Sequence, residues 1–284
     1  MTLASVAFKT EFAVDMTCQN CVNAVQGSLR DIPGIERYDI DLEKKRVTII
    51  GKTPPSQLLS ALKSTNRQVI VRGSSPSNSS IPQTAAVSIL ESPLPIPTNI
   101  ASTSNPILAT SPSSSSVELP GMNESEFSQK VFGIARFVQI DPKTILMDLT
   151  VRLPPPSNIG LGVGAAGGWN VYISETGNIV NPPSTTGKQF LNLGKITPDK
   201  DGYADLFKEV EGELWNWVGR GCIVQSESTS PTSTGGEPQS TLGKIFAGVV
   251  ARSAGAWSNE KTVCACSGRT MWEEGRDMEK KTKL

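Results

Sequence analysis

The 284-residue chain contains no histidine. Histidine is required for Ser-His-Asp and Cys-His catalytic arrangements, for HExxH zinc sites and for imidazole acid–base chemistry. Its absence excludes these active sites and leaves cysteine, methionine, aspartate and glutamate as candidate metal ligands. Cysteine is scarce, and thiolate is the obvious ligand that its five copies offer: Cys18, Cys21, Cys222, Cys264 and Cys266.

Net charge and long apolar runs are also missing. The 27 basic residues are balanced by 27 acidic ones, so we expect no nucleic-acid partner. No apolar run approaches the roughly 18 residues that span a bilayer, so we expect no stable membrane insertion. Lys9 and Glu11 interrupt the stretch where a secretion signal would have its apolar core. We therefore expect a reducing compartment, where closely spaced cysteines more often bind metals or exchange disulfides than form structural ones.

Serine and proline are in excess over residues 74–120. This stretch contains 14 serines and 8 prolines but only two charged residues, Glu91 and Glu118. Such a composition cannot bury enough apolar surface to offset its ordering entropy, so it predicts a disordered linker. The predicted organisation is then a domain over residues 1–73, the linker, a second domain over 121–252 and a flexible tail over 253–284.

The first domain shows alternating strand and helix patterns. Helices are predicted over residues 18–32 and 54–65, and strands over 5–14, over a hairpin at 35–51 and over 67–73. The order βαββαβ predicts an α+β ferredoxin-like fold. After the linker, short β-runs alternate with turns rich in glycine, proline and asparagine, which predicts an all-β sandwich or barrel. Its expected strands cover residues 130–140, 144–153, 167–177, 202–210, 221–227 and 245–253.

The first cysteine pair lies in the sequence Met16-Thr17-Cys18-Gln19-Asn20-Cys21, just before the first predicted helix. The helix N-terminus stabilises thiolate through its dipole and free N–H groups. Thiolates bind copper(I), zinc or iron–sulfur clusters, but a structural zinc site requires four ligands. Two exposed sulfurs suit copper(I) that must later be released. The thioether of Met16 could add a ligand, although such a methionine more often anchors the loop.

An MxCxxC loop in a βαββαβ frame resembles the heavy-metal-associated domain of copper chaperones. Those domains commonly place a basic residue before the last strand, which offsets the negative charge of the bis-thiolate complex. Arg67 matches that position.

The second domain resembles Cu/Zn superoxide dismutase, which implies a Greek-key barrel. "GIARFVQ" is similar to the first strand of that family, and "LGKITPDKDGYADL", "VGRGCIVQSE" and "KIFAGVVARSAG" are similar to later segments. Tyr172, Ser174 and Gln225 match the positions of copper-ligating histidines, and Asn192 matches a metal-binding aspartate. Neutral oxygens bind copper and zinc poorly, so we expect no dismutase activity and neither metal in this domain.

The resemblance also locates the disulfide of the dismutase family. Ala247 stands at one of its cysteine positions, and the other falls near Pro182-Pro183, so the chain has no counterpart of this bond. Cys222 lies within an apolar strand and is expected to be a buried core thiol.

The tail resembles the third domain of the copper chaperones for superoxide dismutase through Cys264-Ala265-Cys266, Gly268 and Trp272-Glu273-Glu274. The chain is identified as a fungal-like member of that family, which implies a metallochaperone rather than an enzyme. In this scheme Cys18 and Cys21 take copper(I) from a copper importer or another donor, and the dismutase-like domain forms a heterodimer with Cu/Zn superoxide dismutase. Cys264 and Cys266 then deliver copper and promote the client's disulfide by thiol exchange.

The resemblance further implies a cytoplasmic protein with a smaller pool in the mitochondrial intermembrane space. Homodimerisation in isolation stays open, as does the identity of the tail cysteine that forms the mixed disulfide. Two other functions also stay open: a metal-independent thiol–disulfide oxidoreductase and a passive copper-buffering protein.

Overall fold

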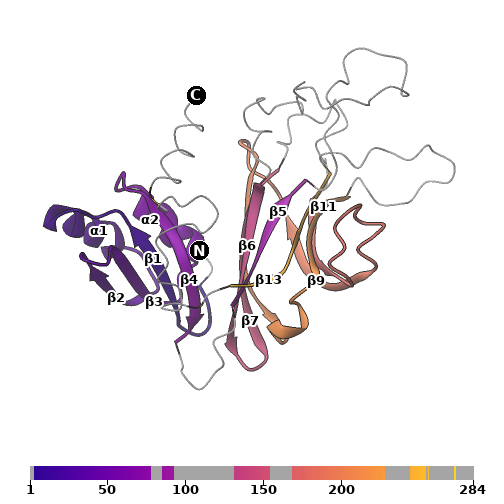
Figure 1. The fold of residues 1–284 in the computed structure, drawn as a ribbon, viewed down its shortest axis with the longest axis horizontal. Helices are drawn as coiled ribbons and strands as arrows, with labels where there is room; N and C mark the ends of the chain where they lie inside the picture. The colour runs from indigo at the N-terminus through magenta and orange to yellow at the C-terminus, as the bar shows by residue number, and fades with distance from the viewer. Residues whose placement is uncertain are drawn as a thin grey trace, which may run out of the picture.

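The computed structural model describes residues 3–77, 85–92, 131–153, 168–227 and 244–253, together with Gly255 and Trp272. Two β-rich units lie next to each other (Figure 1). The first unit, residues 3–77, combines a four-stranded sheet with two helices, and the second unit, residues 85–253, is built on a nine-stranded sheet. Within the described part of the chain, no helix is long and apolar enough to cross a membrane.

The first unit has the predicted ferredoxin-like order, with strands arranged β2-β3-β1-β4 in an antiparallel sheet. Its core lies between the sheet and the helices, where Val25 and Leu29 of α1 point inward one turn apart and are almost fully buried. Gly34 follows α1 with φ +87°, a conformation that glycine adopts at little cost, and allows the chain to turn into β2. The elements are β1 (Phe8–Val14), α1 (Gln19–Arg30), β2 (Ile35–Asp41), β3 (Arg46–Gly51), α2 (Pro55–Lys63) and β4 (Val69–Pro76).

The second unit is an all-β, nearly closed sheet with the strand order β10-β7-β6-β5-β12-β11-β8-β9, to which β13 adds by pairing with β5. The end strands β9 and β10 also approach each other, which confirms the predicted barrel-like fold. Its elements are β5 (Ala85–Glu91), β6 (Val131–Asp141), β7 (Thr144–Arg152), β8 (Trp169–Ser174), β9 (Gln189–Ile196), β10 (Tyr203–Glu211), a 3-10 turn (Leu214–Asn216), β11 (Gly221–Ser226), β12 (Ile245–Val249) and β13 (Ala251–Ser253).

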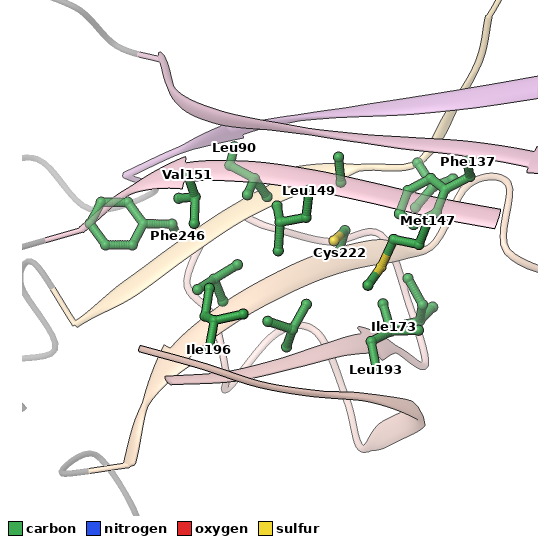
Figure 2. Close-up of a cluster of buried hydrophobic side chains, with 14 of the residues drawn as sticks. Leu90, Phe137, Met147, Leu149, Val151, Ile173, Leu193, Ile196, Cys222 and Phe246 are labelled. Atoms are coloured by element: carbon green, nitrogen blue, oxygen red, sulfur yellow. The ribbon is translucent and has the colours of Figure 1, made fainter. Parts of the chain in front are cut away.

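The core of the second unit is formed by side chains from strands on opposite sides of the sheet. Figure 2 shows Leu149 and Val151 of β7 extending toward Ile173, Leu193 and Ile196 of strands β8 and β9. Alternate residues of β7 point into this core, as expected for a strand with period-two patterning. The inward-facing side chains of strands that are not neighbours in the sheet therefore meet in one apolar core.

The predicted linker is wrong in two places. Residues 85–91 form β5, which pairs with β6 and β12 in the middle of the second sheet, and β4 continues to Pro76. In β5, the small and apolar residues Ala86, Ser88 and Leu90 are buried on one face. This strand was missed because serine and proline dominate the composition around it. Residues 78–84 and 93–120 lie outside the described residues.

Two further expectations about the second unit need correction. The segment "GIARFVQ" belongs to β6, which follows β5 and is therefore not the first strand of this sheet. Strand β9 was also absent from the expected strands. Strand β9 lies at the end of the sheet, and most of its residues are exposed or half-buried. Its sequence therefore lacks the regular alternation of apolar and polar residues that predicts a strand.

Candidate functional site

The first cysteine pair lies where the sequence predicts it, between β1 and α1. Cys18 caps α1 in an extended conformation, with φ −157° and ψ 170°. Its carbonyl oxygen accepts hydrogen bonds from the N–H groups of Cys21 at 3.0 Å and Val22 at 3.4 Å. This first turn brings the two sulfur atoms within 3.6 Å of each other. We refer to residues 15–21 as the cysteine loop.

The two thiols have different surroundings. Cys18 is exposed, whereas only 7% of Cys21 is accessible. Hydrogen bonds from the Thr17 N–H, the Arg67 side chain and the Thr17 hydroxyl lower the pKa of Cys21 to about 6, and they outweigh the opposing effect of burial. Cys21 is therefore mostly thiolate at neutral pH, which is the form that binds metals.

Arg67 enters the site from the loop before β4, as predicted. Its Nη1 donates to the Thr65 carbonyl oxygen at 2.7 Å, which restrains the guanidinium while the side chain also contacts Cys21. The backbone just after Arg67 is tied to the cysteine loop, because the N–H of Asp15 donates to the Gln68 carbonyl oxygen at 3.0 Å. A positive charge is thereby held next to the two sulfurs.

Met16 is part of the hydrophobic core of the first unit and is only 1% exposed. This placement confirms its role as an anchor beneath the loop. Among the residues that the structure describes, no cluster of three or more Cys, Asp or Glu side chains is arranged to hold a metal ion. The first pair therefore offers two sulfur ligands, one exposed and one partly shielded.

The dismutase-like ligand positions are occupied by polar groups whose hydrogen bonds are made within the protein. Tyr172 donates its hydroxyl proton to Oε1 of Gln225 at 2.8 Å, and burial raises the pKa of Tyr172 to about 12. The Ser174 hydroxyl donates to the Thr176 carbonyl oxygen at 2.7 Å. Oδ1 of Asn192 accepts the Gly194 N–H at 2.7 Å. Each of these side-chain oxygens is engaged in a hydrogen bond within the barrel, and the absence of metal here stays a prediction.

Cys222 lies in the barrel core and is fully buried, as predicted (Figure 2). Burial raises the pKa of its thiol to about 12, so it is not a ready nucleophile or ligand. Ala247, at the position of the lost disulfide, packs against Tyr172 and Ile223 in a separate apolar cluster.

Cys264 and Cys266 lie outside the described residues. Trp272, six residues beyond Cys266, is described, and Nζ of Lys45 lies 5.6 Å from the centroid of its indole ring. Lys45 also forms an ion pair with Asp15 at 2.6 Å. Trp272 therefore contacts the first unit beside the cysteine loop. The sequence carried no signal for this contact, since Lys45 is recognisable only as a turn residue.

The chain is similar in sequence to known proteins over nearly its whole length. The heavy-metal-associated domain family matches residues 11–76. The superoxide dismutase 1 copper chaperone of Debaryomyces hansenii is 32% identical, with 94% of both chains covered. The human copper chaperone for superoxide dismutase is 30% identical over 93% of this chain and 88% of its own. The solved copper(I)-loaded first domain of the human copper chaperone for SOD1 is 35% identical, with a TM-score of 0.23, over 26% of this chain and 99% of its own.

Proposed function

Because this chain belongs to the copper chaperones for superoxide dismutase, we propose that it delivers copper(I) to a Cu/Zn superoxide dismutase and promotes formation of the client's disulfide. It is a metallochaperone and not an enzyme. The observation that carries the proposal is the pair formed by Cys18 and Cys21, whose sulfurs lie 3.6 Å apart at a helix N-terminus.

Copper capture follows from the unequal surroundings of the two thiols. Cys21 supplies a thiolate near neutral pH, and Arg67 offsets part of the negative charge of a bis-thiolate complex. Cys18 is exposed, so a third thiolate from a donor or acceptor can approach the metal from the solvent. Copper(I) accepts low coordination numbers with soft ligands, which makes such ligand exchange easy. The incoming copper is supplied by a copper importer or another donor.

Delivery is assigned to Cys264 and Cys266. The contact of Trp272 with Lys45 supports this assignment, because it places the tail beside the cysteine loop. Cys266 and Trp272 are six positions apart in the sequence, a separation that spans at most about 22 Å when extended, so we infer that Cys266 can reach the cysteine loop. Two sulfurs one residue apart can receive copper(I) together. Once an external two-electron oxidant has converted them to a disulfide, one client thiolate attacks a tail sulfur, and the second client thiolate breaks the mixed disulfide and releases the tail as a dithiol.

The client-binding face is assigned to the loop after β8 and the neighbouring ends of β11 and β12. This loop packs tightly against the start of β11, since a Cβ atom on Gly177 would lie 2.1 Å from the carbonyl oxygen of Gly219. Val180 in the loop is 76% exposed and Val249 of β12 is 38% exposed. Exposed apolar side chains on an ordered face are typical of a protein interface. A heterodimer with superoxide dismutase would cover them, and a homodimer would compete for the same face.

We place the protein in the cytoplasm, with a smaller pool in the mitochondrial intermembrane space. Copper capture at Cys18 and Cys21 needs both sulfurs as free thiols. This requirement supports the placement, because a reducing compartment keeps cysteines in that form.

The test mixes the full chain, loaded with copper(I), with apo, reduced Cu/Zn superoxide dismutase. The readouts are complex formation, dismutase activity and oxidation of the client's cysteines. We expect the Cys264→Ser/Cys266→Ser variant to bind the client without activating it, and Cys18→Ser/Cys21→Ser to lose tight copper(I) binding. Cys222→Ala is the matched control, since it removes a thiol that the proposal does not use.

Each alternative function predicts a different result in this assay. A metal-independent oxidoreductase would oxidise the client equally well without copper and would not bind copper(I) through Cys18 and Cys21. A copper buffer would form no complex and would leave the client inactive. Full activation by the variant lacking both tail cysteines would refute the assigned delivery step.

A further inference from the structure

The two domains meet around a buried carboxylate, Asp148 on β7 of the dismutase-like domain. Asp148 is only 3% exposed. Its Oδ2 accepts the backbone N–H of Ser56 at 2.9 Å, and its Oδ1 accepts the Ser56 hydroxyl at 2.8 Å. Nη1 of Arg136 on β6 lies 3.7 Å from the same carboxylate. The copper domain thus donates two hydrogen bonds to a buried carboxyl group of its neighbour. Burial raises the pKa of Asp148, and the Arg136 guanidinium and the Ser56 hydrogen bonds oppose this rise.

Helix α2 of the copper domain provides no cap of its own. Its N-cap residue is Pro54, which has no side-chain hydrogen bond to the helix, and its first turn contains no acidic residue. Pro55, the first helical residue, has no N–H group, so the Ser56 N–H is the first that needs an acceptor. A carboxylate at this end of a helix also interacts favourably with the helix dipole. Asp148 supplies from the other domain the cap that the local sequence lacks.

A small apolar cluster between the two domains lies near the hydrogen bonds of Asp148. Ala4 and Phe8 of the copper domain pack against a small cluster on the dismutase-like domain: Val138, Ile140 and Leu146. The N–H of Ser5 also donates to Oε1 of Glu209 at 2.5 Å. Asp148 and Ser56 also line a cleft of about 1060 Å³ between α2 and strands β6, β7 and β10. Strand β4 of the copper domain also packs along β6 and β5, so the hydrogen bonds at Asp148 set the domain orientation together with this strand contact.

We infer that Asp148 is an inter-domain helix cap that locks the copper domain onto the dismutase-like domain in one orientation, so that the two move as a single body. Removal of the carboxylate takes both acceptors from Ser56. It also leaves Arg136, whose side chain is 17% exposed, without its charged partner. The lock does not depend on metal or on the proposed function.

The lock determines where the cysteine loop lies. Strand β1 starts at Phe8 in the joint and ends at Val14, next to the cysteine loop. Seven residues of strand span about 20 Å, so the loop is held at the far end of the copper domain. There it stays open to solvent but cannot swing toward the client-binding face. If the proposed function holds, copper must therefore be moved by the tail and not by motion of the copper domain.

Backbone ¹⁵N relaxation of the full, metal-free chain tests the lock. In the wild type we expect one rotational correlation time for the cores of both domains. In Asp148→Ala we expect the value for the copper domain to fall by about twofold, because it then tumbles as a smaller body. Amide exchange at Ser56 should accelerate by about tenfold or more as its acceptor is lost. Asp201→Asn, which removes a charge from the exposed turn before β10, should match the wild type.

Two results would overturn this inference. One is a pair of different correlation times in the wild type. The other is an Asp148→Ala variant with a single correlation time and an unchanged Ser56 exchange rate. If Asp148→Ala disturbs the barrel, Ser56→Ala serves in its place, since it removes one of the two hydrogen bonds and leaves the barrel sequence intact. It should show the same loosening to a smaller degree, and an unchanged correlation time for the copper domain would contradict the lock. Copper transfer is measured separately, so failure of the delivery scheme would leave these results standing.

Discussion

Replacement of Arg67 by leucine should weaken the acidity of Cys21. The Arg67 side chain is one of the hydrogen-bond donors that hold the pKa of Cys21 at about 6, behind the Thr17 N–H. An ordinary cysteine has a pKa of about 8.5, so at pH 7 the native site is about 90% thiolate where a free cysteine would be about 3%. Loss of a neighbouring positive charge raises a thiol pKa by about one unit or more.

A shift of that size has a definite pH signature. With the pKa of Cys21 moved to about 7, the thiolate fraction at pH 6 falls about fivefold, whereas at pH 7 it falls only about twofold. The assay is iodoacetamide alkylation of Cys21 across this pH range, in a Cys18→Ser background that leaves one reactive thiol in the loop. The midpoint of the rate profile reports the pKa even though partial burial slows the reaction.

Arg37→Leu is the matched control, because Arg37 is an exposed residue of β2 on the surface of the same domain. It should keep the midpoint near pH 6. The reasoning would be refuted by a native midpoint close to that of free cysteine, or by an Arg67→Leu profile that overlays the native one.

The other predictions concern stability and docking. Because the pKa of Cys21 is lower in the folded than in the unfolded state, its contribution to copper-domain stability should be complete above about pH 8.5 and be lost as the pH falls through about 6, as measured by urea unfolding. Cys222→Ser buries a hydroxyl in the barrel core and should lower the free energy of unfolding by about 1–3 kcal/mol in the same assay. Tyr172→Phe removes a hydrogen-bond donor and should cost about 1 kcal/mol in urea unfolding while client activation persists. Gly177→Ala forces a Cβ atom against backbone in the assigned docking face, so it should lower the affinity for reduced superoxide dismutase in titration calorimetry.

Controls make these outcomes specific. Cys21→Ser should abolish the pH dependence between pH 6 and 8.5. Gly27→Ala is the partner control for Gly177→Ala, because nothing lies within 4 Å of its added Cβ atom and alanine favours the helix. Equal client affinity for Gly177→Ala and the wild type would contradict the assigned face.

Local chemistry made much of the site predictable. The spacing of Cys18 and Cys21 places two sulfurs in the first turn of a helix wherever that helix forms, because the geometry involves only four consecutive residues. The apolar face containing Val25 and Leu29 follows from the helical period in the same way. The basic residue before the last strand was identified by position, and the structure adds that its side chain contacts Cys21.

Other features depend on residues far apart in the chain. Strand β5 gains its stability by pairing with β6 and β12, and a short apolar run within a serine-rich stretch does not reveal those partners. The bond from Ser56 to Asp148 joins positions 92 residues apart.

By itself, the sequence determined the two fold classes and the cysteine loop through residue type and short-range periodicity, and its resemblance to the dismutase family predicted the loss of the metal ligands. Tertiary structure decided the acidity of Cys21, the pairing of Tyr172 with Gln225 and the orientation of the copper domain at Asp148. These depend on which groups come within hydrogen-bond distance once water is excluded, and that is settled only when the distant strands and helices have packed together.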